Sequence, residues 1–168
     1  MKMELIQPFI NSLDAVIAET MGCSAEIADV TMEEGNYQRT GVAALVGITG
    51  EIEGRVILDM DTATAHQAAG ELTGGTAERV EEAARETVCE LTNMVIGNAV
   101  TELNNIGFKF RVHPPEIYEW SSELLGSRDT EAVVLRFVTP KGAVYLNIAV
   151  RYKQRRASER MAKGVLCP

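Results

Sequence analysis

The sequence predicts an α+β fold, with a mixed, largely antiparallel sheet of about six strands and long helices packed on one face. Two long segments, 3–21 and 77–105, carry apolar residues at helical spacing and stop at Gly22 and Gly107. Each is followed by three strand-like segments, the last two of which are typical of a hairpin. This order repeats once, so two similar halves can share one sheet with both long helices on the same face.

The first long helix is predicted by a row of apolar residues that recurs every three or four positions. The row consists of Leu5, Ile6, Phe9, Leu13, Val16, Ile17 and Met21. After it, residues 25–32 alternate well enough for a strand, with Ile27 and Val30 expected to point inward, and 33–36 are expected to form a turn.

A hairpin and a short helix complete the first half. Strand-like segments 40–48 and 52–60 are joined by Thr49-Gly-Glu51, which is typical of a hairpin turn. Asp61 is a favourable N-cap residue, which predicts a helix over 62–73.

The second half begins after Gly74-Gly75, where Thr76 is expected to cap the helix 77–105. The elements expected after this helix are, in order, a short strand over 108–112, a loop-like stretch over 116–130, and a second hairpin formed by 132–138 and 143–152. Pro114-Pro115 follows the short strand and prevents sheet hydrogen bonding there.

The helix 77–105 carries different residues on its two sides. The stripe expected to face the core is Val80, Ala84, Thr87, Val88, Leu91, Val95, Asn98, Ala99 and Glu102. The polar line opposite is Glu86, Glu90, Asn93 and Gly97, flanked by Ile96 and Val100. A solvated face is the ordinary explanation for two glutamates. Asn93 and Gly97 are poor helix formers, however, with Gly costing about 1 kcal/mol relative to Ala, which favours a face that is used for binding or chemistry.

The stretch Glu90-Leu-Thr-Asn93-Met-Val-Ile-Gly97 resembles the signature helix of the CheX, CheC and FliY group of chemotaxis phosphatases, and most closely that of CheX. That motif is Asp or Ser, three residues, Glu, two residues, Asn, and a Pro about 23 residues later. Glu90 and Asn93 match it, Glu86 replaces the Asp or Ser, and the Pro114-Pro115 pair comes one or two residues early. The resemblance extends to the first helix and to strands 41–60, so it covers most of the chain and implies a CheC-like fold.

The resemblance implies hydrolysis of the aspartyl phosphate on a CheY-like response regulator. An acyl phosphate is already activated, so positioning a water molecule can supply much of the rate. The Asn93 amide can orient water without adding negative charge, while Glu90 is better suited to pair with a lysine of the partner. Gly97 and Val100 would let the partner approach closely, with Glu86 nearby. The Mg²⁺ that coordinates the phosphoryl group would belong to the partner, so this chain is expected to bind no cofactor.

The repeat predicts one such site per chain. Aligning the two long helices at their terminal glycines places Leu5 and Pro8 opposite Glu90 and Asn93. The first helix therefore lacks the motif. Edge strands rich in Val, Ile and Leu can pair with another copy, and the resemblance suggests a homodimer with a sheet continuous across subunits.

Composition places limits on the function. With 168 residues, 46% of them hydrophobic, the chain can form one globular domain, expected over 1–152. Its net charge of −8 argues against nucleic-acid binding, and no apolar run is long enough to span a membrane. Three cysteines without a CxxC pair fit a reducing cytoplasm, and the two histidines have no metal-ligand spacing. The basic tail over 153–168 is either a solvated extension or a contact for an acidic partner.

Two other functions are compatible with the sequence. A non-catalytic binding module could use the same helix face to hold a receiver domain or a flagellar component without turnover, and the departures at Glu86 and at the prolines favour it. A structural or assembly domain unrelated to signalling is the third possibility.

Overall fold

The computed structural model describes residues 2–74, 80–118, 124–125 and 131–153. Its elements, in order, are α1 (Met3–Met21), β1 (Glu26–Glu34), β2 (Tyr37–Gln38), β3 (Val42–Gly50), β4 (Ile52–Met60), α2 (Thr62–Thr73), α3 (Val80–Ile106), β5 (Phe110–Val112), β6 (Glu116–Tyr118), β7 (Leu124–Leu125), β8 (Glu131–Thr139) and β9 (Gly142–Tyr152). The expected Thr76 cap and the basic tail from 154 onwards lie outside the described residues.

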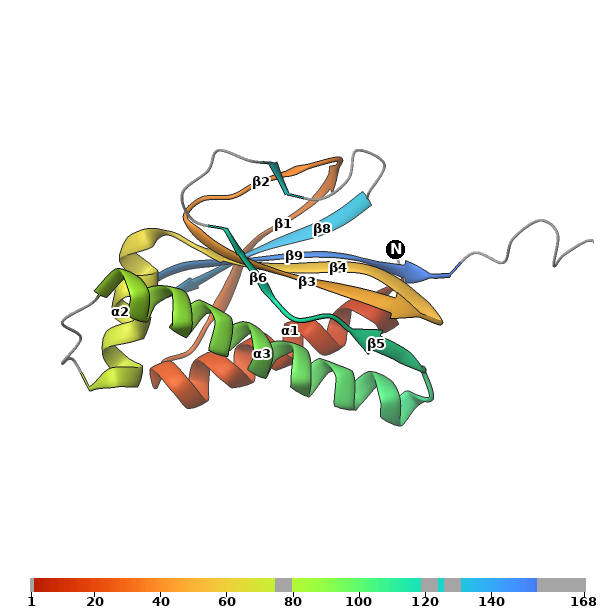
Figure 1. Cartoon of the computed structure of the whole chain (residues 1–168), viewed down its shortest axis with the longest axis horizontal. Helices are drawn as coiled ribbons and strands as arrows, with labels where there is room; N and C mark the ends of the chain where they lie inside the picture. The colour runs from red at the N-terminus through yellow and green to blue at the C-terminus, as the bar shows by residue number, and fades with distance from the viewer. Residues whose placement is uncertain (1, 75–79, 119–123, 126–130, 154–168) are drawn as a thin grey trace, which may run out of the picture.

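The molecule has two layers. One layer is a seven-stranded sheet in the order β1-β8-β9-β4-β3-β5, with β6 also paired to β3. The other is formed by α1 and α3, which lie side by side on one face of this sheet, with α2 beside them at one end (Figure 1). The predicted α+β class and the placement of both long helices on one face are confirmed. Every strand pair in the described part of the chain is antiparallel, so the sheet is less mixed than expected.

The two halves of the chain exchange their first strands. Strand β1 of the first half pairs with β8 of the second, while β5 and β6 of the second half pair with β3 of the first. The hairpins β3–β4 and β8–β9 meet in the centre through β4 and β9, from Ile52 opposite Tyr152 to Met60 opposite Val144. Because each half completes the sheet of the other, the two are expected to fold as one cooperative unit.

The main core lies between the helices and the sheet. It contains Phe9 and Leu13 of α1, Val88 and Leu91 of α3, and alternate residues of the central strands such as Leu146. A second, smaller apolar cluster lies on the opposite face of the sheet around Tyr37, Ala43, Ile57 and Val134. None of the described helices is long and apolar enough to cross a membrane.

Local signals in the sequence place the helix ends correctly. Asp61 caps α2 by accepting a hydrogen bond from the Thr64 backbone N–H at 2.7 Å. Gly22 ends α1 and Gly107 follows α3, both with positive φ, a conformation that glycine adopts without strain.

The prediction that Ile27 and Val30 point into the core is wrong. In register with Phe137 and Leu135, they face the helix side of the sheet, yet they are 47% and 55% exposed. Strand β1 is the outermost strand, and every one of its residues is exposed. An irregularity in the strand between Ile27 and Asp29 brings Ile27 and Val30, three positions apart, onto the same face, but the helices do not cover this edge.

The stretch after Pro114-Pro115 is more ordered than predicted. Residues 116–118 form β6 and pair with β3 from Ala43 to Leu45, although a loop was expected. The two prolines interrupt the edge between β5 and β6 because proline has no N–H to donate. The strands continue on either side because each pairs separately with β3.

The buried side of α3 also differs in part from the predicted stripe. The buried residues are Ala84, Thr87, Val88, Leu91, Thr92, Val95, Ile96, Ala99 and Leu103. Three residues predicted in the core are exposed instead: Val80, Asn98 and Glu102. A single straight stripe would be buried if the helix packed against one flat neighbour. This 27-residue helix instead packs against α1, α2 and β3, so the side that is buried changes along its length.

Candidate functional site

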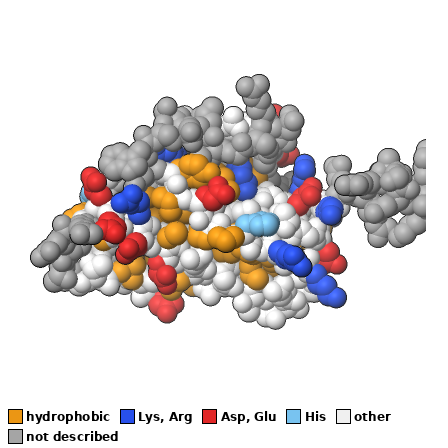
Figure 2. All heavy atoms as spheres, in the orientation of Figure 1, with side chains coloured by type: hydrophobic (Ala, Val, Ile, Leu, Met, Phe, Trp, Pro, Cys, Tyr) orange, Lys and Arg blue, Asp and Glu red, His pale blue; other side chains and the backbone are white. Residues whose placement is uncertain are grey.

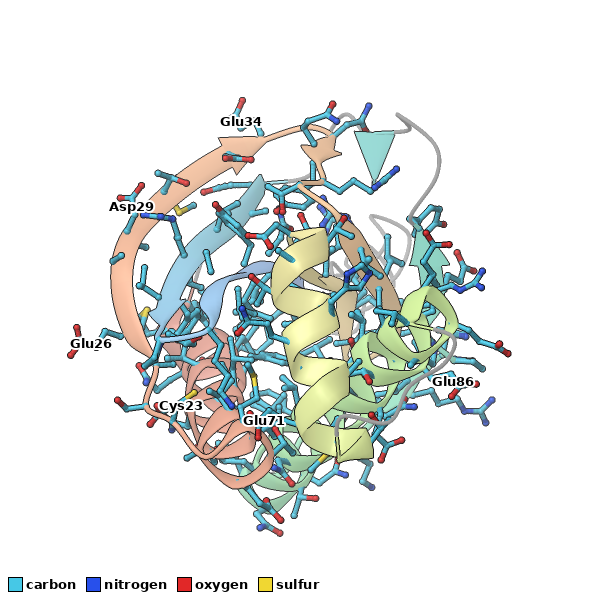
Figure 3. All side chains as sticks on the ribbon, turned by 90° about the vertical axis from the view of Figure 1, so that its left-hand side faces the viewer. Cys23, Glu26, Asp29, Glu34, Glu71 and Glu86 are labelled. Carbon is cyan, nitrogen blue, oxygen red and sulfur yellow. The ribbon has the colours of Figure 1, made fainter. Side chains whose placement is uncertain are left out.

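The polar line of α3 lies on the surface, as predicted. Glu86, Glu90, Asn93 and Gly97 are all exposed, while the opposite side of the helix is buried in the core. Figure 3 shows the Glu86 side chain pointing outward from the molecule. With a rise of 1.5 Å per residue, the four positions extend over roughly 16 Å of the helix axis.

The three polar side chains of this line form no polar contact with any residue that the structure describes. Among the described residues, none forms a hydrogen bond or ion pair with Glu86, Glu90 or Asn93. An amide or carboxylate that folding has not used can bind a partner without first breaking an internal contact. The described residues also contain no group of His, Cys, Asp and Glu that could hold a metal ion.

Helix α3 is held firmly behind this face. The buried Ser12 hydroxyl of α1 donates a hydrogen bond to the Val95 carbonyl of α3 at 2.6 Å. One turn earlier, the buried Thr92 hydroxyl donates to the Val88 carbonyl. The Ser12 bond ties α3 to α1 near the level of Asn93, whereas the Thr92 bond lies within α3 itself. Nothing in the sequence points to this role of Ser12 except that it is a small polar residue within the apolar row of the first helix.

Gly97 has no packing role within the protein. A Cβ placed on it would meet no heavy atom within 4 Å, apart from its own helix backbone. Glycine is therefore not required there by crowding, and it costs helix stability. Of the two residues expected to flank the polar line, Val100 is half-buried, whereas Ile96 is only 4% exposed and belongs to the core.

The surface around the line combines apolar and acidic groups. Figure 2 shows hydrophobic side chains in a band between α3 and strands β5 and β6, with acidic side chains towards the start of α3. Glu81 and Glu82 lie in the first turn of α3, where negative charge is favourable to the helix dipole. The same charges make this end of the face better suited to a basic surface than to an acidic one.

Comparison with known proteins agrees with this geometry. The model of the family described as chemotaxis phosphatase CheX matches residues 42–137, which include all of α3. No curated protein matches the chain.

Solved structures share the fold over nearly the whole chain. A CheC-like superfamily protein from Shewanella sp. PV-4 superposes with a TM-score of 0.80 at 22% identity, covering 90% of this chain and 99% of that one. The chemotaxis protein CheX from Vibrio vulnificus gives 0.77 at 21% identity, covering 88% and 99%. A chain of the CheX-CheY-BeF3-Mg²⁺ complex from Borrelia burgdorferi gives 0.69 at 29% identity, covering 87% and 97%. The predicted CheC-like fold is confirmed.

Proposed function

Because the chain belongs to the CheX family of chemotaxis phosphatases, we propose that it hydrolyses the aspartyl phosphate of a CheY-like response regulator. The observation that carries this proposal is the exposed pair Glu90 and Asn93 on the rigidly held helix α3, at the spacing of the family motif. A receiver domain as partner would place the protein in the cytoplasm.

Asn93 is proposed to act on the attacking water. Its amide carbonyl can accept a hydrogen bond from the water while its NH₂ group donates one to the phosphoryl oxygens. The amide is uncharged, so it adds no repulsion beside a phosphoryl group, and an acyl phosphate needs no strong base. Its contribution would be to hold water in line for attack, which is a contribution of position rather than of proton affinity.

Glu90 is proposed to fix the partner in register. It lies three residues before Asn93, on the same exposed side of α3, so both can reach the same partner surface. A carboxylate there can pair with a lysine of the receiver, and such a charge-assisted bond strengthens once the interface excludes water. Gly97 and Val100 would allow close approach on one side, and Glu86 would contribute a weaker contact on the other.

The metal ion of the reaction is proposed to come with the partner. The Borrelia burgdorferi complex was solved with CheY, BeF3 and Mg²⁺ together. For this chain, we propose that Mg²⁺ held by the receiver neutralises the phosphoryl oxygens, while α3 supplies the amide and the carboxylate.

A non-catalytic receiver-binding module is the second candidate. The observation in its favour is Glu86, which stands where the family motif has Asp or Ser and adds a negative charge beside the phosphoryl group. The third possibility, a domain unrelated to signalling, has no support once the chain belongs to a chemotaxis family.

One pair of measurements separates the two candidates. The decay of a phosphorylated CheY receiver is followed with and without this protein, and binding to the same receiver loaded with BeF3 and Mg²⁺ is measured in parallel. Faster decay together with binding supports the phosphatase. Binding with unchanged decay would favour the binding module, and no binding would contradict both.

We also propose that the protein pairs with a second copy through the edge of β1. Strand β1 exposes the three apolar side chains Ile27, Val30 and Met32, at 47%, 55% and 54%. Next to them, an open pocket of about 380 Å³ between α1 and the start of β1 is lined in part by Ile10 and Phe137. A strand from a second copy could hydrogen-bond to the open edge of β1 and cover its exposed apolar row.

A further inference from the structure

The face of the sheet opposite to α1 and α3 contains a buried arginine with unused donors. Arg55 of β4 is only 7% exposed, and its Nη1 donates a hydrogen bond to Oδ1 of the buried Asn147 at 2.6 Å. Its Nε and Nη2 are shut off from solvent and have no hydrogen-bond partner among the residues that the structure describes. The guanidinium is thus held at one corner and unpaired along the edge formed by the other two nitrogens.

This arrangement is unfavourable unless something pairs with it. Burial lowers the pKa of the Arg55 guanidinium, since it disfavours the charged form, but arginine keeps its proton under physiological conditions. A buried charge without a partner is strongly unfavourable even after the surroundings relax. Nε and Nη2 point in parallel from one edge, and this is the edge that grips two oxygens of a carboxylate or phosphate at once.

The acids nearest along β4 are already committed. Asp59 accepts hydrogen bonds from the Tyr37 hydroxyl at 2.9 Å, from the Thr40 backbone N–H at 2.6 Å and hydroxyl at 3.0 Å, and from the Gly41 N–H at 3.2 Å. Burial together with this carboxylate raises the pKa of Tyr37, so the Tyr37 hydroxyl stays a donor to Asp59. Glu53, on the other side, pairs with Arg151 at 3.3 Å.

The neighbours of Arg55 across the strands are small. In register it lies between Gly47 of β3 and Ala149 of β9, which give this face almost no side-chain volume beside the guanidinium. The atoms nearest to a Cβ placed on Gly47 would be those of the His113 side chain, at 3.4 Å and beyond. The surroundings therefore combine a donor edge, an amide that orients it and small residues on both sides.

We propose that Arg55 anchors a binding site for one small oxyanion, a carboxylate or a phosphate, on the sheet face opposite to the polar line of α3. Asn147 acts as the positioning residue, because it holds Nη1 and thereby directs the Nε–Nη2 edge. Since both donors are shut off from solvent, the ion exchanges only when this face opens, and its binding appears as added stability of the folded state.

The test is the melting temperature of the wild-type protein as sodium chloride is replaced by sodium acetate or sodium phosphate at constant ionic strength. Arg55→Met removes the donor edge, and Arg136→Met, on the same face of β8 but exposed, is the matched control. Wild type and Arg136→Met are expected to gain several degrees that Arg55→Met does not gain. A gain in acetate alone identifies a carboxylate site, and a gain in phosphate alone a phosphate site.

An equal gain in all three proteins would show a general salt effect and overturn the proposal, as would no gain in the wild type. If Arg55→Met does not fold, Arg55→Lys keeps the charge without the paired donors and serves in its place. As an independent check, the Nε–H resonance of Arg55 in the ¹⁵N-labelled wild type is expected to shift on acetate or phosphate titration, and a resonance that both anions leave unmoved would overturn the proposal.

Discussion

The two halves of the molecule follow one plan and expose different surfaces. Each has a long helix followed by a glycine, then an edge strand, then a hairpin in the centre of the sheet. Where α3 exposes Glu90 and Asn93, α1 buries Leu5 and Pro8 in the core. The same position in the plan is thus exposed to solvent in one half and packed into the core in the other.

The edge strands of the two halves also differ, and here it is the first half that exposes the surface open to a partner strand. In the first half, β1 is one strand of nine residues, with a register shift between Ile27 and Asp29 and an exposed apolar row. In the second half, the edge is divided into β5 and β6 by Pro114-Pro115. A proline pair cannot donate to an added strand, so only the β1 edge remains open to pairing along its length. The surface proposed for the receiver and the edge proposed for self-pairing therefore lie on different halves of the chain.

The largest effect, on the free energy of unfolding, is expected from giving α1 the residue that α3 has at the equivalent position. Leu5→Glu places a carboxylate at a core position that is 1% exposed and has no described cation beside it. This substitution is expected to lower the free energy of unfolding by about 3 kcal/mol or more. The reverse change, Glu90→Leu, lies on the surface and is expected to leave stability close to wild type. Urea unfolding measures both. If the two substitutions changed the free energy of unfolding equally, burial would not distinguish these two positions.

Asn93→Ala tests the chemistry on the exposed helix. Removing a group that acts in the transition state typically costs about 100-fold or more in rate, so single-turnover decay of the phosphorylated receiver is expected to slow by that order. Binding to the BeF3-loaded receiver is expected to persist, because Asn93 is exposed and its loss leaves the fold intact. Decay at the wild-type rate would refute the role assigned to Asn93 and favour the binding module.

Glu90→Ala separates docking from chemistry. Loss of a charged partner buried in an interface costs on the order of 2–5 kcal/mol, so affinity for the receiver is expected to fall by about 30-fold or more. Glu86→Ala removes the same charge one turn away and is expected to do less. Titration of both variants against the BeF3-loaded receiver provides the comparison. If both weaken binding equally, general charge attraction is at work rather than a specific pair.

Local patterns in the sequence were enough for the three helices, for the glycines that follow them, for the Asp61 cap of α2 and for both hairpins. Contacts between distant segments were not accessible, because they depend on which strands and helices meet. Ser12 reaches Val95 across 83 positions and Arg55 reaches Asn147 across 92, so no spacing rule connects them. The exposure of Val30 likewise depends on β1 being the last strand, which its own alternation does not reveal.

The difference between the edges can be tested with one substitution on each. Val30→Lys on β1 is expected to raise the dissociation constant of the dimer by about tenfold or more, since an edge lysine opposes strand pairing. Val112→Lys on β5 is the matched control, because Val112 is also an exposed valine on the helix side of an edge, at 37%. Sedimentation equilibrium measures both. A monomeric wild type, or equal loss in both variants, would contradict pairing through β1.

The smallest effect on stability is expected at Gly97, which also provides the sharpest test of the exposed face of α3. Gly97→Ala is expected to stabilise the protein by up to about 1 kcal/mol, because alanine favours the helix and a Cβ there meets nothing. Gly70→Ala in α2 is the matched control, since its Cβ also has open space. If a partner approaches α3 closely, only Gly97→Ala should weaken receiver binding while both variants gain thermal stability. A stabilised Gly97→Ala that binds the receiver as well as wild type would show that the partner does not approach the helix at this point, and would place the contact nearer to Glu86.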